Sequence, residues 1–95
     1  MNFGQALEVM KDGKKVARAG WNGKRMFIYY VEGTEVPASQ LRGNALKQVG
    51  VLHPPHGTHQ KINGHIDMFA ADGSIVVGWL ASQTDMLAED WEIID

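Results

Sequence analysis

An aromatic ring and basic side chains lie close together in one turn of this sequence. Trp21 is flanked by glycines and stands between Arg18 and Lys24. This set suits a nucleotide, because the ring can stack on a base while the cationic groups meet the phosphates. Trp79, at the end of an expected strand, offers a second ring. Either ring could instead fill the core with its N–H bonded to a carbonyl, and the sequence alone leaves both alternatives open.

A second group of polar side chains follows Trp79. Ser82, Gln83, Thr84 and Asp85 stand where a short helix is expected to begin. Hydroxyls and free backbone N–H groups at a helix N-terminus can receive a phosphate or a ribose hydroxyl, and a carboxylate can accept from a hydroxyl or an amino group. The alternative is that Ser82 and Asp85 only cap the helix.

Three histidines recur at every third position, and a fourth follows: His53, His56, His59 and His65. Three imidazoles can hold a zinc ion. On a Pro-Pro-Gly loop they need not converge, and no zinc-protease motif accompanies them. We therefore expect no metal ion, and a polar loop that reaches a ligand or a neighbouring subunit.

Motifs of common enzyme chemistry are missing from the sequence. It has no glycine-rich phosphate loop, no G-x-S-x-G nucleophile elbow and no cysteine. We expect a binding protein rather than an enzyme, and no cofactor. The lack of cysteine also excludes disulfides and fits a cytoplasmic location.

Length and composition limit the classes of partner. The 95 residues fit one domain, 1–95, and a chain of this size often gains stability by pairing with copies of itself. No apolar run approaches the roughly 18 residues that would span a membrane. The net charge of −2 argues against binding a DNA or RNA polymer, which normally needs a strong basic excess.

The charges are unevenly distributed along the chain. Residues 11–25 carry six Lys and Arg against one acid, whereas residues 67–95 carry seven acids and no Lys or Arg. The first segment can attract anions. Alternatively, the two segments pair with each other, within a chain or across an oligomer.

The apolar pattern predicts an α+β domain with an antiparallel sheet, an N-terminal helix and a short C-terminal helix. Asn2 and Gln5 have capping-box spacing ahead of the first helix, which Asp12-Gly13 should end. Strands are expected over residues 15–18, 26–31, 66–70, 75–77 and 91–94, with a hairpin turn between the third and fourth.

Expectations for the remaining segments are as follows. Met86 and Leu87 should face inward from the C-terminal helix, and Trp91 should be a core residue of the last strand. Residues 32–64 hold all three prolines and read as a loop-rich insertion with one short helix within 39–49.

Two blocks of the sequence resemble a family of short phage and prophage proteins, the second Thoeris anti-defence family. They comprise residues 1–8 with 13–24, and residues 79–91, which include the run Trp-Leu-Ala-Ser-Gln-Thr-Asp. Residues 66–68 and 71–73 also fit. Two departures stand out: Gly78 replaces a proline common in the family, and residues 32–64 show no clear family pattern.

The resemblance implies a small α+β domain that assembles into homotetramers with ligand pockets at subunit contacts. It implies binding, without cleavage, of the cyclic ADP-ribose isomers that TIR-domain proteins make in Thoeris defence, and in some members of cyclic dinucleotides from CBASS defence. Together with Lys24, the matching positions give the candidate ligand-binding residues: Arg18, Trp21, Asn22, Trp79, Ser82, Gln83, Thr84 and Asp85.

Each candidate has an expected role. Trp21 or Trp79 would stack on adenine, Arg18 would meet the pyrophosphate, and Thr84 with Asp85 would bond ribose hydroxyls. Two other functions remain open. The protein could inhibit a host defence enzyme directly through residues 32–64, or it could degrade the nucleotide with a metal held by the histidines at 53, 56 and 59.

Overall fold

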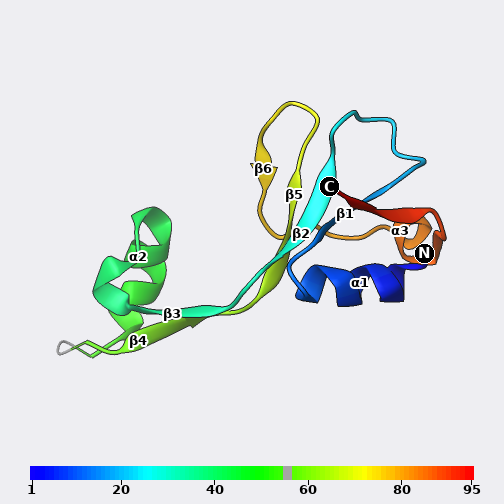
Figure 1. The fold of residues 1–95 in the computed structure, drawn as a ribbon. Coiled ribbons are helices and arrows are strands. Elements are labelled where there is room, and N and C mark those ends of the chain that lie inside the picture. Colours follow the sequence, from blue (N-terminus) through cyan, green and yellow to red (C-terminus); the bar gives the residue numbers. More distant parts are fainter. Residues whose placement is uncertain (55–56) are drawn as a thin grey trace. The chain divides into compact units, whose positions relative to one another are not determined.

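The computed structural model describes residues 1–54 and 57–95. The chain is a small α+β domain whose residues form two compact units (Figure 1). Unit 1 combines Met1–Val31 with His65–Asp95, and unit 2 is Glu32–Gly64. All the candidate ligand-binding residues belong to unit 1.

Unit 1 is built on a five-stranded antiparallel sheet. The strand order is β6-β5-β2-β1-β7, so that the last strand of the chain pairs with the first. The strands are β1 (Lys15–Arg18), β2 (Phe27–Val31), β5 (His65–Phe69), β6 (Ile75–Val76) and β7 (Trp91–Ile94). These match the five strands expected from the sequence to within a residue at each end.

Two helices accompany this sheet, and both begin with a capping box. In α1 (Phe3–Lys11) the Asn2 side chain accepts from the backbone of Gln5, whose own side chain accepts from the backbone of Asn2. In α3 (Gln83–Leu87), Ser82 and Asp85 make the same reciprocal pair. Each box satisfies two of the N–H groups that a helix leaves unpaired at its start.

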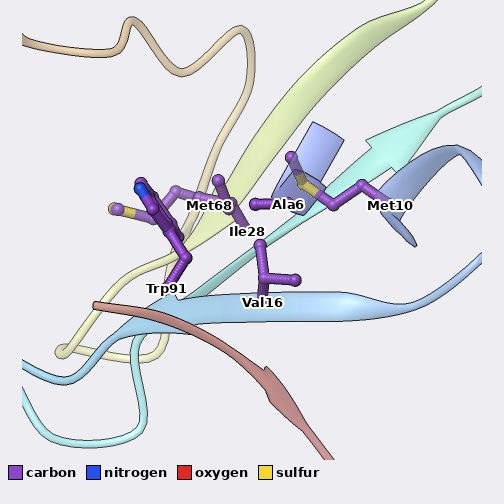
Figure 2. Close-up of a cluster of buried hydrophobic side chains, with 6 residues drawn as sticks. All are labelled: Ala6, Met10, Val16, Ile28, Met68 and Trp91. Atoms are coloured by element: carbon purple, nitrogen blue, oxygen red, sulfur yellow. The ribbon is translucent and has the colours of Figure 1, made fainter. Parts of the chain in front are cut away.

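The core of unit 1 lies between α1 and one face of the sheet (Figure 2). Cross-strand partners Val16, Ile28 and Met68 share this face because they pair directly, and Ala6 and Met10 of α1 pack on them. Trp91 is 2% exposed and completes the cluster, which confirms the prediction that it is a core residue.

The other face of the sheet, which we call the outer face, presents Lys15, Phe27, Tyr29, Phe69 and Ile94. These residues alternate with the core positions along their strands and are half-buried. Phe27 and Phe69 stack at 5.1 Å between ring centroids, and the Lys15 ammonium lies 4.8 Å from the centre of the Phe27 ring. Strand and loop residues line two grooves on this face.

Unit 2 contains more regular structure than its sequence predicts. An antiparallel pair of strands, β3 (Thr34–Pro37) and β4 (His59–Ile62), forms its two-stranded sheet. Between these strands lie the 3-10 turns η1 (Ala38–Gln40) and η2 (Gly50–Leu52), on either side of α2 (Gly43–Val49). The expected helix within residues 39–49 corresponds to α2, but the two strands were not expected.

One orientation expected from the sequence is wrong. Met86 and Leu87 do not face inward: they are 46% and 79% exposed. The space beneath α3 is occupied by Trp91, whose indole N–H donates to the Asp85 carbonyl at 3.0 Å, so the helix meets the core through Asp85 and Ala88.

Candidate functional site

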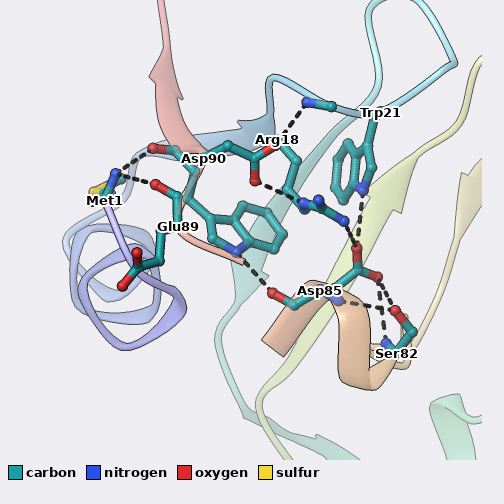
Figure 3. A network of polar contacts seen from close by, with 9 residues as sticks. Met1, Arg18, Trp21, Ser82, Asp85, Glu89 and Asp90 are labelled. Atoms are coloured by element: carbon teal, nitrogen blue, oxygen red, sulfur yellow. Dashed lines mark hydrogen bonds and ion pairs between the residues drawn. The ribbon is translucent and has the colours of Figure 1, made fainter. Parts of the chain in front are cut away.

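A hydrogen-bonded network joins the end of β1 to α3 and to the residue before β7 (Figure 3). At its centre, Arg18 Nε donates to Oδ1 of Asp90 at 2.8 Å, and Arg18 Nη1 donates to Oδ1 of Asp85 at 2.9 Å. The pairing of β1 with β7 produces this arrangement, because Arg18 lies opposite Trp91 and therefore beside Asp90. The guanidinium thus bridges two carboxylates.

The loop after β1 is tied to the same network. The backbone N–H of Gly20 donates to Oδ2 of Asp90 at 2.8 Å, and that of Ala19 donates to the Asp90 carbonyl at 3.0 Å. Trp21 follows immediately, and its indole N–H donates to Oδ1 of Asp85 at 3.1 Å. These bonds therefore hold both the backbone that leads to Trp21 and the Trp21 ring.

Charge and hydrogen bonding shift the acid–base properties of this network. The hydrogen bonds that Arg18 donates to Asp90, and then to Asp85, raise its pKa. The bond from Arg18 lowers the pKa of Asp90. Burial alone would raise the pKa of Asp85, but the bonds from Arg18, Trp21 and Ser82 outweigh it, and the pKa is lowered. All three groups are ionised at neutral pH, leaving the network one negative charge in excess.

The three tryptophans of the chain form one cluster beside this network. Trp21 meets Trp91 edge-on at 5.3 Å and Trp79 edge-on at 6.2 Å, measured between ring centroids. Trp79 and Trp91 are 6.4 Å apart. Trp21 and Trp79 are partly buried against the core cluster, whereas Trp91 lies within it. Edge-to-face packing restricts the planes of the two outer rings.

Trp21 and Arg18 also line a groove of about 400 Å³ on the outer face. Two further cations, Lys15 and Arg25, line the same groove, together with Met26 and Phe27. The Arg25 backbone has a φ of 63°, which is uncommon for a residue with a side chain. Such conformations cluster at functional sites, where the surrounding structure holds them.

The structure gathers some of the predicted site residues and separates others. It brings together Arg18, Trp21, Ser82 and Asp85 by hydrogen bonds and places Trp79 against Trp21. Asn22 and Lys24 are exposed in the loop after Trp21, and Gln83 and Thr84 are exposed in the first turn of α3. The capping role that the sequence left open for Ser82 and Asp85 is present.

Sequence reasoning missed four residues that matter here. Asp90 was not singled out, nor were Lys15, Arg25 and Phe27 of the groove. The complementary charge of the two ends of the chain was the available clue to Asp90, and Arg18 shows that these ends do pair. Lys15 and Arg25 belong to the basic segment 11–25 that was expected to attract anions, but only the sheet brings them together with Phe27.

The histidines belong mainly to unit 2. His53 contacts Thr58, and its Nε2 lies 2.9 Å from Oε1 of Gln60. His65 lies 3.4 Å from Asp67, and His56 falls outside the described residues. In residues 1–54 and 57–95, no three His, Cys, Asp or Glu side chains gather as they would around a metal ion.

Comparison with known proteins places the whole chain in one family. Residues 1–94 match the model of the Thoeris anti-defense 2-like domain. The chain belongs to this family. Thoeris anti-defense 2 of Bacillus phage SP01 is 35% identical over 94 residues, which span 99% of this chain and 94% of that protein. The family resemblance of the two sequence blocks is thereby confirmed.

One further property concerns membranes. None of the helices in the described part of this Thoeris anti-defense 2-like chain combines the length and the apolar character needed to span a bilayer.

Proposed function

We propose that this protein binds a cyclic nucleotide immune messenger in the cytoplasm of the infected bacterium and withholds it, uncleaved, from its receptor. Membership of a Thoeris anti-defense family supports a role against host defence. The first ligand to test is a cyclic ADP-ribose isomer made by a TIR-domain protein, and cyclic dinucleotides of CBASS defence are the second.

The observation that carries this proposal is the groove beside Trp21. Trp21 and three basic residues, Lys15, Arg18 and Arg25, are among the residues that line one groove of about 400 Å³. That volume lies in the range of small-molecule sites, roughly 300–1,000 Å³. Trp21 would stack on the base. Lys15 and Arg25 would attract the phosphates more than Arg18, whose charge is already matched by two carboxylates.

Sequestration demands tight binding. A protein that sequesters a messenger must outcompete a sensitive receptor. We therefore expect a nanomolar dissociation constant, which corresponds to a binding free energy of about −12 kcal/mol. A shallow groove on one small chain buries too little of a ligand for this affinity, whereas a pocket closed by a second chain can surround it. The proposed function therefore includes a homo-oligomer, expected to be a tetramer.

The outer face is the proposed contact between copies. Phe27, Tyr29 and Phe69 form a half-buried apolar surface, and the Trp21 groove borders it through Phe27. Phe69→Asp should lower the mass measured by light scattering. Lys11→Asp, at an exposed residue of α1, is the control that should leave it unchanged. A monomeric wild-type protein would contradict this part of the proposal.

Calorimetry with a cyclic ADP-ribose isomer, and separately with cyclic dinucleotides, tests the function. The complex is then heat-denatured and the released molecule identified by mass spectrometry. Tight binding and recovery of intact ligand are expected, and Arg25→Ala should weaken binding while Lys11→Ala, at an exposed residue of α1, should not. Absence of uptake would refute the proposal, and recovery of an altered molecule would identify an enzyme.

A second function is favoured by a feature of unit 2. Val51 and Leu52 of η2 are adjacent and 76% and 78% exposed. Exposed apolar side chains of this kind often mark a protein contact. If the chain inhibits a defence enzyme directly, the double variant Val51→Ser, Leu52→Ser should lose anti-defence activity while nucleotide uptake is unchanged. If anti-defence activity is lost only in variants that also lose nucleotide uptake, sequestration of the messenger is favoured.

A further inference from the structure

The Asp85 carboxylate is fully occupied by donors from its own chain. Its Oδ1 accepts from Arg18 at 2.9 Å and from the Trp21 indole at 3.1 Å. Its Oδ2 accepts from the Ser82 hydroxyl at 2.9 Å and from the Ser82 backbone N–H at 3.4 Å. A carboxylate offers about four lone-pair positions, so these four donors leave none for a ligand hydroxyl.

Asp85 also lies outside the groove that its partners line. Arg18 and Trp21 are among the residues that line the groove, whereas Asp85 is not. The carboxylate is therefore placed to hold the indole and the guanidinium in position from the protein side. We propose that Asp85 is a positioning residue, which holds the Trp21 ring and the Arg18 guanidinium in place beside the groove rather than contacting the ligand.

This proposal rests on the proposed function and replaces one sequence-based expectation, that Asp85 bonds a ribose hydroxyl. Its physical basis is preorganisation. A side chain that is already fixed before the ligand arrives loses less conformational freedom on binding, which is worth roughly two- to tenfold in affinity for one large side chain. Without Asp85 the Trp21 indole would lose its hydrogen-bond partner and turn more freely about its side-chain bonds.

Asp90 provides a comparison for the loss of one Arg18 partner. Both Asp85 and Asp90 accept from Arg18, but in the described contacts only Asp85 accepts from the Trp21 indole. Asp85→Ala and Asp90→Ala each remove one partner of Arg18. We expect Asp85→Ala to weaken binding of the cyclic ADP-ribose isomer about two- to tenfold. Asp90→Ala, which also removes the acceptor of the Gly20 N–H, should weaken it less. Asp72→Ala, at an exposed turn residue outside the site, should change it less than about twofold.

A double-mutant cycle separates this role from helix capping. Trp21→Phe keeps an aromatic ring but removes the N–H donor, so it should weaken binding about as much as Asp85→Ala. In the Trp21→Phe background, Asp85→Ala should then have little further effect. If Asp85 acted only as the α3 cap or on the ligand itself, it would weaken binding by the same factor in both backgrounds, and the proposal would be overturned.

Exchange of the indole N–H protons in the ligand-free protein gives an independent readout by NMR. The Trp21 signal, assigned by its loss in Trp21→Phe, should exchange faster in Asp85→Ala and remain protected in Asp90→Ala. Unchanged protection in Asp85→Ala would overturn the proposal. If Asp85→Ala does not fold, an unaltered affinity of the Trp21→Phe variant would by itself overturn the proposal. If instead the wild-type protein takes up no nucleotide, the proposed function fails. The exchange rate of the Trp21 indole N–H still tests whether Asp85 keeps the Trp21 ring in place.

Discussion

Trp91 donates its indole N–H to the main-chain carbonyl of Asp85 at 3.0 Å, and Trp91 itself is 2% exposed. The side chain of Asp85 accepts from a second tryptophan, Trp21. One residue of α3 therefore connects the core strand β7 with the Trp21 ring. Changes in the core of unit 1 should alter the position of Trp21 through this residue.

Trp91→Phe should lower the free energy of unfolding by about 1–3 kcal/mol. The substitution leaves a gap in the core and removes the donor to the Asp85 carbonyl. Leu87→Ala, at a position 79% exposed, should change it by no more than about 0.5 kcal/mol. Urea denaturation followed by circular dichroism measures both. Equal effects of the two substitutions would show that Trp91 does not occupy the core.

Replacing Arg18 should destabilise the fold more than replacing an exposed cation. Arg18→Met leaves the carboxylates of Asp85 and Asp90 near each other without a counter-charge. Arg18→Lys should recover only part of the loss, because an ammonium group lacks the fork that donates in two directions. Lys11→Met, which breaks a solvent-exposed pair with Glu8, is the control. The order of the melting temperatures should be wild type and Lys11→Met, then Arg18→Lys, then Arg18→Met.

The free energy of unfolding should fall in acid, because folding lowers the pKa values of several aspartates. The folded pKa values of Asp85 and Asp90 lie below the ordinary value of 3.8 that they regain on unfolding. The unfolded chain therefore binds more protons in this range, so the stabilisation is complete above about pH 5 and is lost as the pH falls through 3.8 and below. Asp72, whose pKa is lowered by bonds from Ser74, contributes in the same direction.

Urea midpoints at several pH values from 7 to 3 measure this effect. Asp90→Asn should flatten part of the acid dependence, because the amide does not titrate. An Asp90→Asn protein that loses stability in acid as steeply as the wild type would contradict the assignment of this residue to the pH dependence.

Asn2→Ala should cost about 1 kcal/mol of stability. The Asn2 side chain accepts from the Gln5 backbone N–H at 2.8 Å and starts the helix that covers the core. Asn2→Ser should retain most of the stability, since serine is an equally good cap. Thermal denaturation distinguishes the two, and equal losses would mean that the cap bond is unimportant.

The sequence predicted the sheet and the helix ends of unit 1 because their causes are local. β2 is a run of β-branched and aromatic residues, and both capping boxes place their partners three residues apart. The role of Arg18 could not be predicted in this way. Its carboxylate partners lie 67 and 72 residues further along the chain, and only the pairing of β1 with β7 brings them beside it.

The two-stranded sheet of unit 2 was not predicted, for a different reason. β3 and β4 have no alternation of buried and exposed residues, since a two-stranded sheet of this kind has little core to face. β3 also ends in Pro37, which argues against a central strand. In a two-stranded sheet every strand is an edge, so the proline is tolerated.

The attachment of unit 2 has a consequence for engineering and for the evolution of the family. Val31, the last residue of β2, pairs with His65, the first of β5. The chain thus leaves and re-enters the sheet at neighbouring ladder positions, about 5 Å apart. Any segment whose two ends can span that distance preserves the strand register, whatever its length. Insertions and deletions between these residues are therefore compatible with an unchanged sheet, and the junction is a natural place to graft a reporter or another domain.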